Sequence, residues 1–76
     1  MILDVVLNKT DDGYTAEIPS INGCECWAHE EDAALEKIIE LASYYLKVDL
    51  KKFKLDRARR NNMQTIYKLV FDKVIS

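Results

Sequence analysis

The spacing of the apolar residues changes sharply at Glu30, and no other feature of the sequence constrains the fold as strongly. Before Glu30 apolar and polar residues mostly alternate, a period of two that is typical of strands with one buried face. After Glu30 the apolar residues recur at three and four positions, which predicts one amphipathic helix. The helical stripe consists of Ala34, Leu35, Ile38, Leu41, Ala42 and Tyr45. Strands followed by one helix predict a small α+β domain, with the helix on one face of an antiparallel sheet.

The first strand and its turn lead into a predicted hairpin. The apolar face of the first strand consists of Leu3, Val5 and Leu7. Residues 10–13 are turn formers, and Gly13 is expected to supply a positive φ there. The second strand starts at Tyr14 and ends before Pro19, because proline cannot donate a hydrogen bond to a sheet.

A third strand is expected after the corner at residues 20–23. Cys24, Cys26 and Ala28 share one face of it, and Glu25 and Trp27 point the other way. A tryptophan opposite the core-facing side either lies under a neighbouring segment or marks a contact surface.

The C-terminal part of the chain is less clearly patterned. The helix has an acidic start, which suits the positive end of its dipole, and is expected to end near Val48. Residues 50–60 fit either a helix or a strand. Residues 64–74 are rich in β-branched and aromatic types and predict a strand. If residues 53–60 are also extended, Asn61 and Asn62 form the turn of a hairpin, for which type I′ is the candidate. The prediction is a β-β-β-α module over residues 1–48 and a basic strand or hairpin over residues 49–76.

The length of 76 residues, about half of them hydrophobic, suits one domain with one core. So small a domain has a thin margin of stability, and we expect a homo-oligomer, a dimer or higher, with Tyr67, Leu69 and Phe71 lying over a second copy. No apolar run is long enough for a signal peptide or a membrane span, so we expect a cytoplasmic protein. Cys24 and Cys26 are too closely spaced on one strand to form a disulfide with each other.

The charges are divided unevenly along the sequence. Residues 1–46 contain ten acids and two bases, a net charge of −8, and residues 47–76 contain nine bases and three acids, a net charge of +6, which together give the overall −2. Such a chain can meet a basic partner with one part and a polyanion with the other.

Two segments carry a resemblance to a known family. They are residues 12–19 (Asp-Gly-Tyr-Thr-Ala-Glu-Ile-Pro) and residues 21–24 (Ile-Asn-Gly-Cys), followed by Ala34 eleven residues after Gly23. With the order of strands, corner and helix over residues 1–48, this pattern resembles the HicB-like antitoxins. The resemblance implies a degraded ribonuclease-H-like fold that binds and blocks a small basic toxin, an mRNA-cleaving ribonuclease, by occlusion. The acidic first part has the right sign for such a partner, and Glu17, Glu25 and Trp27 are the residues predicted to contact it.

Catalytic and metal sites are not expected. Cys24, Cys26 and His29 supply three ligands without the fourth that a structural zinc site usually needs, and two cysteines on one strand face are readily part of a core. The acidic residues that could hold the metal ions of a ribonuclease H site are Asp4, Asp12, Glu17 and Glu25. Alternation and a turn position separate them, so we expect no converging carboxylates, no cofactor and no enzyme; a small hydrolase is the least favoured possibility.

A run of basic residues supports an alternative function. It consists of Lys51, Lys52, Lys54, Arg57, Arg59 and Arg60. With Phe53 among them, these residues could contact phosphates and stack a base in a stand-alone nucleic-acid-binding regulator. Basic residues on an edge strand also protect against aggregation, which is the competing explanation.

Overall fold

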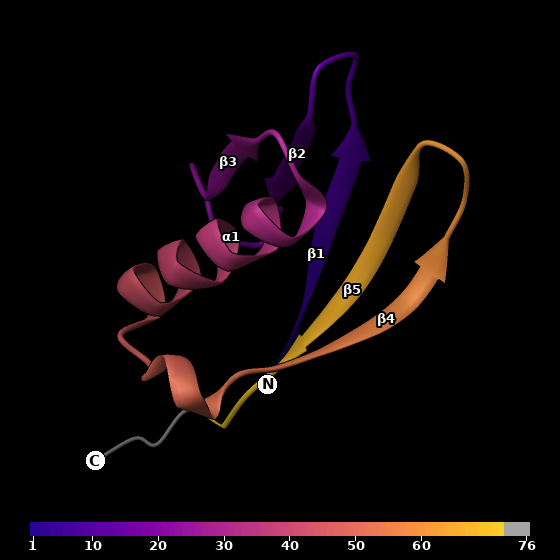
Figure 1. Ribbon diagram of the computed structural model, residues 1–76. Helices are drawn as coiled ribbons and strands as arrows, with labels where there is room; N and C mark the ends of the chain where they lie inside the picture. Colours follow the sequence, from indigo (N-terminus) through magenta and orange to yellow (C-terminus); the bar gives the residue numbers. More distant parts are fainter. Residues whose placement is uncertain (73–76) are drawn as a thin grey trace.

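The computed structural model describes residues 1–72, which form one antiparallel sheet and one long helix (Figure 1). The strands are β1 (Ile2–Lys9), β2 (Tyr14–Glu17), β3 (Glu25–Ala28), β4 (Lys54–Arg60) and β5 (Gln64–Val70). The helix α1 is Glu31–Leu46, and a short 3-10 helix, η1 (Leu50–Lys52), precedes β4. The α+β fold predicted from the change of period is confirmed. Residues 73 and 74 of the predicted last strand lie outside the described residues.

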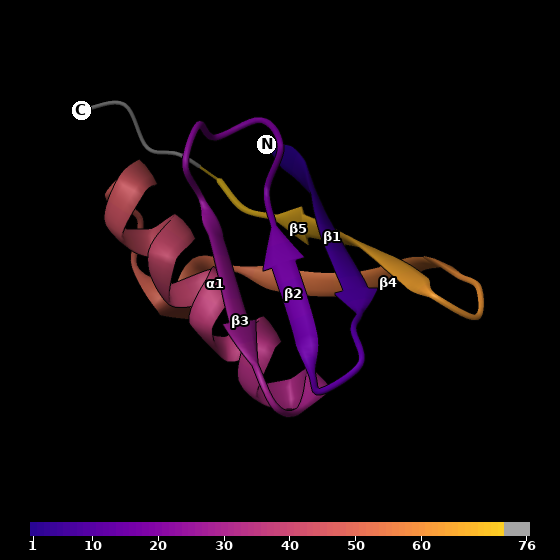
Figure 2. The ribbon, with the colours of Figure 1, turned by 90° about the horizontal axis from the view of Figure 1, so that it is seen from above.

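The strands are ordered β3-β2-β1-β5-β4, and each neighbouring pair is antiparallel. The C-terminal hairpin joins the sheet through β5, which pairs with β1 from Ile2 opposite Val70 to Asn8 opposite Gln64. The sheet twists strongly, so that β4 and β5 run across the direction of β2 and β3 (Figure 2). The β4–β5 hairpin extends beyond the area that α1 covers (Figures 1 and 2).

The core lies between α1 and the sheet. From α1 the fully buried side chains are Ala34, Ile38 and Ala42, and the two alanines allow the helix to approach the strands closely. The sheet contributes Val5, Leu7, Ala16, Ile18, Cys24, Ala28, Tyr67, Leu69 and Phe71. Phe53, just after η1, packs edge-to-face against Phe71, with ring centroids 5.1 Å apart, and extends the core beneath the hairpin.

The expectation that Tyr67, Leu69 and Phe71 cover a second copy is wrong. Their side chains lie on the helix side of β5 and are buried within the single chain, Tyr67 being 7% exposed. The other set of side chains also contains apolar residues, Ile66 and Val70, so the alternation along β5 does not by itself show which set faces the helix.

The helix boundaries agree with the sequence to within two residues. Glu31 and Asp32 occupy the first turn, where the helix dipole stabilises negative charge. The helix ends because Lys47 adopts a left-handed conformation, φ 56°, from which its N–H bonds to the carbonyl oxygen of Ser43.

Residues 50–60, for which the sequence fits a helix or a strand, form η1 and then β4, and β4 pairs with β5 in a hairpin. The N–H of Asn61 donates to the carbonyl oxygen of Gln64 over 2.9 Å, and the side-chain oxygen of Asn61 accepts from the N–H groups of Met63 and Gln64. Within residues 1–72 only Gly23 and Lys47 have positive φ. The predicted type I′ turn is therefore wrong, and the Asn61 side chain closes the turn instead.

Gly13 is needed for close packing and not for a positive φ, which corrects the expectation for the first hairpin. A Cβ atom at this position would lie 2.7 Å from Cζ2 of Trp27 and still closer to the carbonyl oxygen of Ala28. The absence of a side chain at Gly13 therefore allows the Trp27 ring to pack directly against the backbone of the hairpin.

Among the described residues no helix is both long and apolar enough to cross a membrane.

Candidate functional site

The sheet has one face against α1 and one face directed away from it, which we call the open face. The open-face side chains are those that alternate with the core residues: Ile2, Asp4, Val6, Asn8, Thr15, Glu17, Glu25, Trp27, Lys54, Asp56, Arg59, Gln64, Ile66, Lys68 and Val70. Within residues 1–72 the helix α1 packs against the other face, so the side chains of the open face remain available for binding.

The open face changes from acidic to basic across the strands. The pairing register places five side chains in one row from β3 to β4, namely Glu25, Glu17, Val6, Ile66 and Arg59. The row begins with two carboxylates, passes over two apolar residues and ends at a guanidinium. The division of charge seen along the sequence is therefore also a division across this face.

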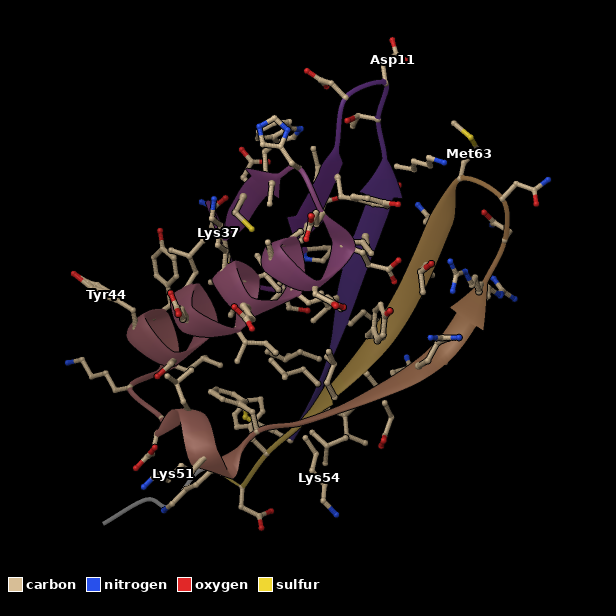
Figure 3. The ribbon with its side chains drawn as sticks, viewed as in Figure 1. Asp11, Lys37, Tyr44, Lys51, Lys54 and Met63 are labelled. Atoms are coloured by element: carbon tan, nitrogen blue, oxygen red, sulfur yellow. The ribbon has the colours of Figure 1, made fainter. Side chains whose placement is uncertain are left out.

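The structure brings the three predicted partner-binding residues together at the acidic side. Glu17 and Glu25 are directly opposite each other on β2 and β3, and Trp27 lies two residues further along β3. Trp27 is 38% exposed, and its ring meets His29 edge-on, with centroids 4.5 Å apart. The Trp27 carbonyl oxygen, on the edge strand, accepts a hydrogen bond of 3.3 Å from Nζ of Lys37, which reaches it from α1 (Figure 3).

The six predicted nucleic-acid-binding residues are not brought onto one surface. Lys54 and Arg59 point to the open face, because they pair with Val70 and Ile66, whereas Arg57 and Arg60 point to the helix side. The remaining two, Lys51 and Lys52, lie on η1, and Figure 3 shows Lys51 and Lys54 at the opposite end of the hairpin from its tip at Met63.

Two polar pairs link β1 and β5 on the open face. Asp4 forms an ion pair with Lys68, and the amide of Gln64 donates to the side-chain oxygen of Asn8 over 3.0 Å. Each pair joins residues that are direct cross-strand neighbours, the arrangement that stabilises a sheet.

A second cluster of polar residues lies on the helix side, where the start of α1 meets the hairpin. The Tyr67 hydroxyl donates to Oε1 of Glu31 over 2.8 Å, and Nη2 of Arg60 lies 3.9 Å from Oε2 of the same residue. Burial, the hydrogen bond to Glu31 and its negative charge raise the pKa of Tyr67, and the nearby Arg57 partly offsets this. The cluster links α1 to the hairpin, and it gives Arg57 and Arg60 partners within the chain.

Cys24 and Cys26, two of the candidate metal ligands, both lie on the core side of the sheet, and the third, His29, lies on the outside. Cys24 is buried in the core, the Cys26 thiol donates to the carbonyl oxygen of Ala34, and His29 lies against Trp27 on the outside. Burial raises the pKa of both thiols, which disfavours the reactive thiolate. In the part of the chain that the structure describes, no three His, Cys, Asp or Glu side chains gather as metal ligands would.

Surface depressions on this protein are small. One, of about 230 Å³, lies between the start of α1 and the tip of the β4–β5 hairpin, and another, of about 320 Å³, lies beside Cys26 and Lys37. Pockets for small molecules usually measure about 300 to 1,000 Å³. The first depression is below this range and the second is at its lower end, so we take the broad open face as the candidate site.

Sequence reasoning missed the apolar residues of the open face, Ile2, Val6, Ile66 and Val70. The sequence does indicate them, because both β1 and β5 have apolar residues among the side chains of each of their two faces. A strand that is apolar on both sides is buried on both sides or binds something.

In comparisons with known proteins, no family model, no curated protein and no solved structure matches this chain.

Proposed function

We propose that this protein is a binding domain whose acidic side of the open face holds a small basic protein. In line with the resemblance to the HicB-like antitoxins, the partner would be an mRNA-cleaving toxin, and binding would silence it by occlusion. The proposal rests on the resemblance of residues 12–24 and on the arrangement of Glu17, Glu25 and Trp27.

The single observation that carries the proposal is the direct pairing of Glu17 with Glu25 beside the exposed Trp27. Like charges directly opposite each other on a sheet are destabilising. A basic partner would neutralise both carboxylates at once, so the isolated domain carries a cost that binding removes. Tryptophan is also enriched among the residues that dominate binding energies, since it offers a large and rigid contact area.

The alternative of nucleic-acid binding has weaker support. The six bases are divided between two faces and η1, and Arg60 is paired with Glu31. A nucleic-acid groove needs its cations along one track. We therefore do not adopt that function.

The proposal requires that a neighbouring gene encode a small basic chain, and co-expression of this protein with such a chain tests it. We expect a complex on gel filtration and loss of the partner's ribonuclease activity. The double variant Glu17→Gln and Glu25→Gln should weaken the complex, because it removes both charges and little volume.

A matched control is available on α1, where Glu36 and Glu40 are exposed on the opposite side of the molecule. The double variant Glu36→Gln and Glu40→Gln makes the same change in net charge and should leave binding unchanged. Absence of any complex, or equal weakening by both double variants, would refute the proposal.

A further inference from the structure

The apolar residues of the open face lie outside the core. Ile2 is 63% exposed, and Val6, Ile66 and Val70 are partly exposed and do not belong to the core cluster or to the residues packed against it. They form two cross-strand pairs along β1 and β5, Ile2 with Val70 and Val6 with Ile66, and the ion pair of Asp4 with Lys68 lies between them; we call these four apolar residues the strip. Within residues 1–72 no segment covers the strip, and such strips mark interaction sites.

The residues around the strip identify its occupant. In a dimer with a two-fold axis between β1 and β5 and parallel to them, each open-face residue faces the counterpart of its own cross-strand neighbour. This follows because a half-turn exchanges the positions of β1 and β5, and those of β2 and β4. The known register therefore gives the contacts of such a dimer without further assumptions.

The contacts obtained in this way are complementary. Val6 faces Ile66 of the second copy, Ile2 faces Val70, and Asn8 faces Gln64. Asp4 faces Lys68, so that the existing ion pairs of two copies form a ring of four alternating charges.

The outer contact is complementary as well. Glu17 on β2 and Arg59 on β4 stand at equal distances from the axis in the same row, so each Glu17 faces an Arg59. A basic foreign partner would match only the acidic side of the face, whereas a second copy matches both sides and the apolar strip between them.

The twist of the sheet is compatible with this packing. A twisted sheet is saddle-shaped, and a half-turn about the strand direction maps a saddle onto itself. Two such faces can nest about 10 Å apart with their strands within about 30° of each other, as in β-sandwiches.

We propose that two copies of this chain dimerise through their open faces about an axis between β1 and β5. The inference goes beyond the proposed function, because it depends only on the register and chemistry of the face. It shares Glu17 with the proposed partner site and leaves Glu25 and Trp27 at the rim of the dimer.

The available area predicts a weak dimer. Three strands about 23 Å long and the shorter β2, about 13 Å long, spaced about 4.8 Å apart, give roughly 400 Å² in projection on each copy, or roughly 800 Å² for the pair. Specific interfaces usually bury at least about 1,000 Å². We therefore expect a dimer whose population depends on concentration, with a dissociation constant of about 1 μM to 1 mM.

Sedimentation analysis over a range of concentrations, together with a charge exchange, tests the proposal. The variants Glu17→Lys and Arg59→Glu each turn both outer contacts of the dimer from attractive to repulsive. Each variant alone should dimerise at least about tenfold more weakly than the natural chain. An equimolar mixture of the two should recover dimerisation, because Lys at position 17 of one chain then faces Glu at position 59 of the other, and the second contact retains its natural pair.

Two further variants separate this interface from general effects of charge and folding. Glu36→Lys on the outer side of α1 makes the same charge change as Glu17→Lys and should leave the dimer unchanged. Ile66→Thr removes an apolar contact at the centre while retaining a β-branched side chain, and should weaken the dimer with no change in circular dichroism.

The proposal is overturned if the natural chain stays monomeric up to about 1 mM. It is equally overturned if dimers form that neither charge variant weakens, or if the mixture fails to recover what each variant loses. None of these measurements involves the basic partner, so this proposal and the proposed function can fail independently.

Discussion

Replacing Gly13 by alanine tests the close packing of the Trp27 ring against the backbone at Gly13. The added Cβ would lie 2.7 Å from Cζ2 and 2.9 Å from Cε2 of the Trp27 ring. Carbon atoms in good contact are about 3.5 to 4.0 Å apart, so the ring has to move outwards by about 1 Å. The carbonyl oxygen of Ala28 is closer still and cannot move freely, because Ala28 is paired with Tyr14 on β2.

The expected cost follows from these distances. Overpacking of this kind usually costs about 1 to 3 kcal/mol, and the loss of glycine's freedom in the unfolded chain returns about 0.4 to 1 kcal/mol. The difference is about 0 to 2.6 kcal/mol, and the clash with the backbone oxygen of Ala28 places the expected loss at about 1 to 2 kcal/mol, a large part of the roughly 4 to 11 kcal/mol expected for a domain of this size. With a denaturant dependence of about 1 kcal/mol per molar urea, the unfolding midpoint should fall by about 1 to 2 M.

The assay uses Trp27 itself, which is the only tryptophan in the chain. Its emission should shift to longer wavelength in folded Gly13→Ala, because the ring is displaced towards water, and urea unfolding followed by this emission should show the lower midpoint. An unchanged midpoint and an unchanged emission maximum would refute the packing role of Gly13.

Gly23 provides the matched control. Its φ of 80° makes alanine strained there, but a Cβ would meet only the Tyr45 hydroxyl oxygen, at an ordinary 3.8 Å. Gly23→Ala should therefore cost about 1 to 2 kcal/mol without shifting the Trp27 emission, and Gly23→Asn should recover part of that cost because asparagine tolerates the left-handed region.

Three further predictions concern the core and the helix side. Tyr67→Phe should cost about 1 to 2 kcal/mol, because Glu31 loses a hydrogen-bond donor. The pKa of Tyr67 in the folded chain lies above its ordinary 10.0, so the natural chain should lose stability as the pH rises from 10.0 to the folded pKa. Denaturation curves at alkaline pH should show this loss for the natural chain and not for the variant. Alkylation of Cys24 and Cys26 with iodoacetamide, followed by mass spectrometry, should be slow until urea unfolds the chain, since burial raises the pKa of both thiols; labelling of both at the rate of a free thiol would contradict their burial. Ile38→Ala should cost about 2 to 5 kcal/mol in urea unfolding, since Ile38 is fully buried between α1 and the sheet, and a cost under 1 kcal/mol would contradict that position.

The N-terminal half of the fold could be predicted because its signals are local. The alternation in β1 and β2, the break at Pro19 and the helical stripe after Glu30 each specify an element within a few residues. The faces of Glu17, Glu25 and Trp27 followed from the same alternation, and the structure confirms that they share a side of the sheet. Their direct juxtaposition required the register, which the sequence does not state.

The C-terminal half was harder because its outcome depends on contacts distant in sequence. Residues 53–60 are extended since they pair with β5, and β5 in turn is held by β1, more than 55 residues away along the chain at Asn8 and Gln64. The type I′ prediction failed because the side chain of Asn61, and not a left-handed backbone, closes the turn.

The apolar residues of the open face were missed because the sequence interpretation placed the wrong set of β5 side chains on the outside. Both faces of β5 carry apolar residues, and Tyr67, Leu69 and Phe71 were expected to face a second copy because one short helix cannot cover both faces of the sheet. Large side chains gain more from burial in the chain's own core, however, so they turn to the helix side and leave Ile66 and Val70 outside. Because β5 lies next to β1 and not at the edge, these smaller residues complete a strip between an acidic and a basic side. If β5 were the edge strand, β4 would lie next to β1, and its basic residues would separate the apolar residues of β1 from those of β5. The self-complementary face is therefore a consequence of strand order rather than of composition.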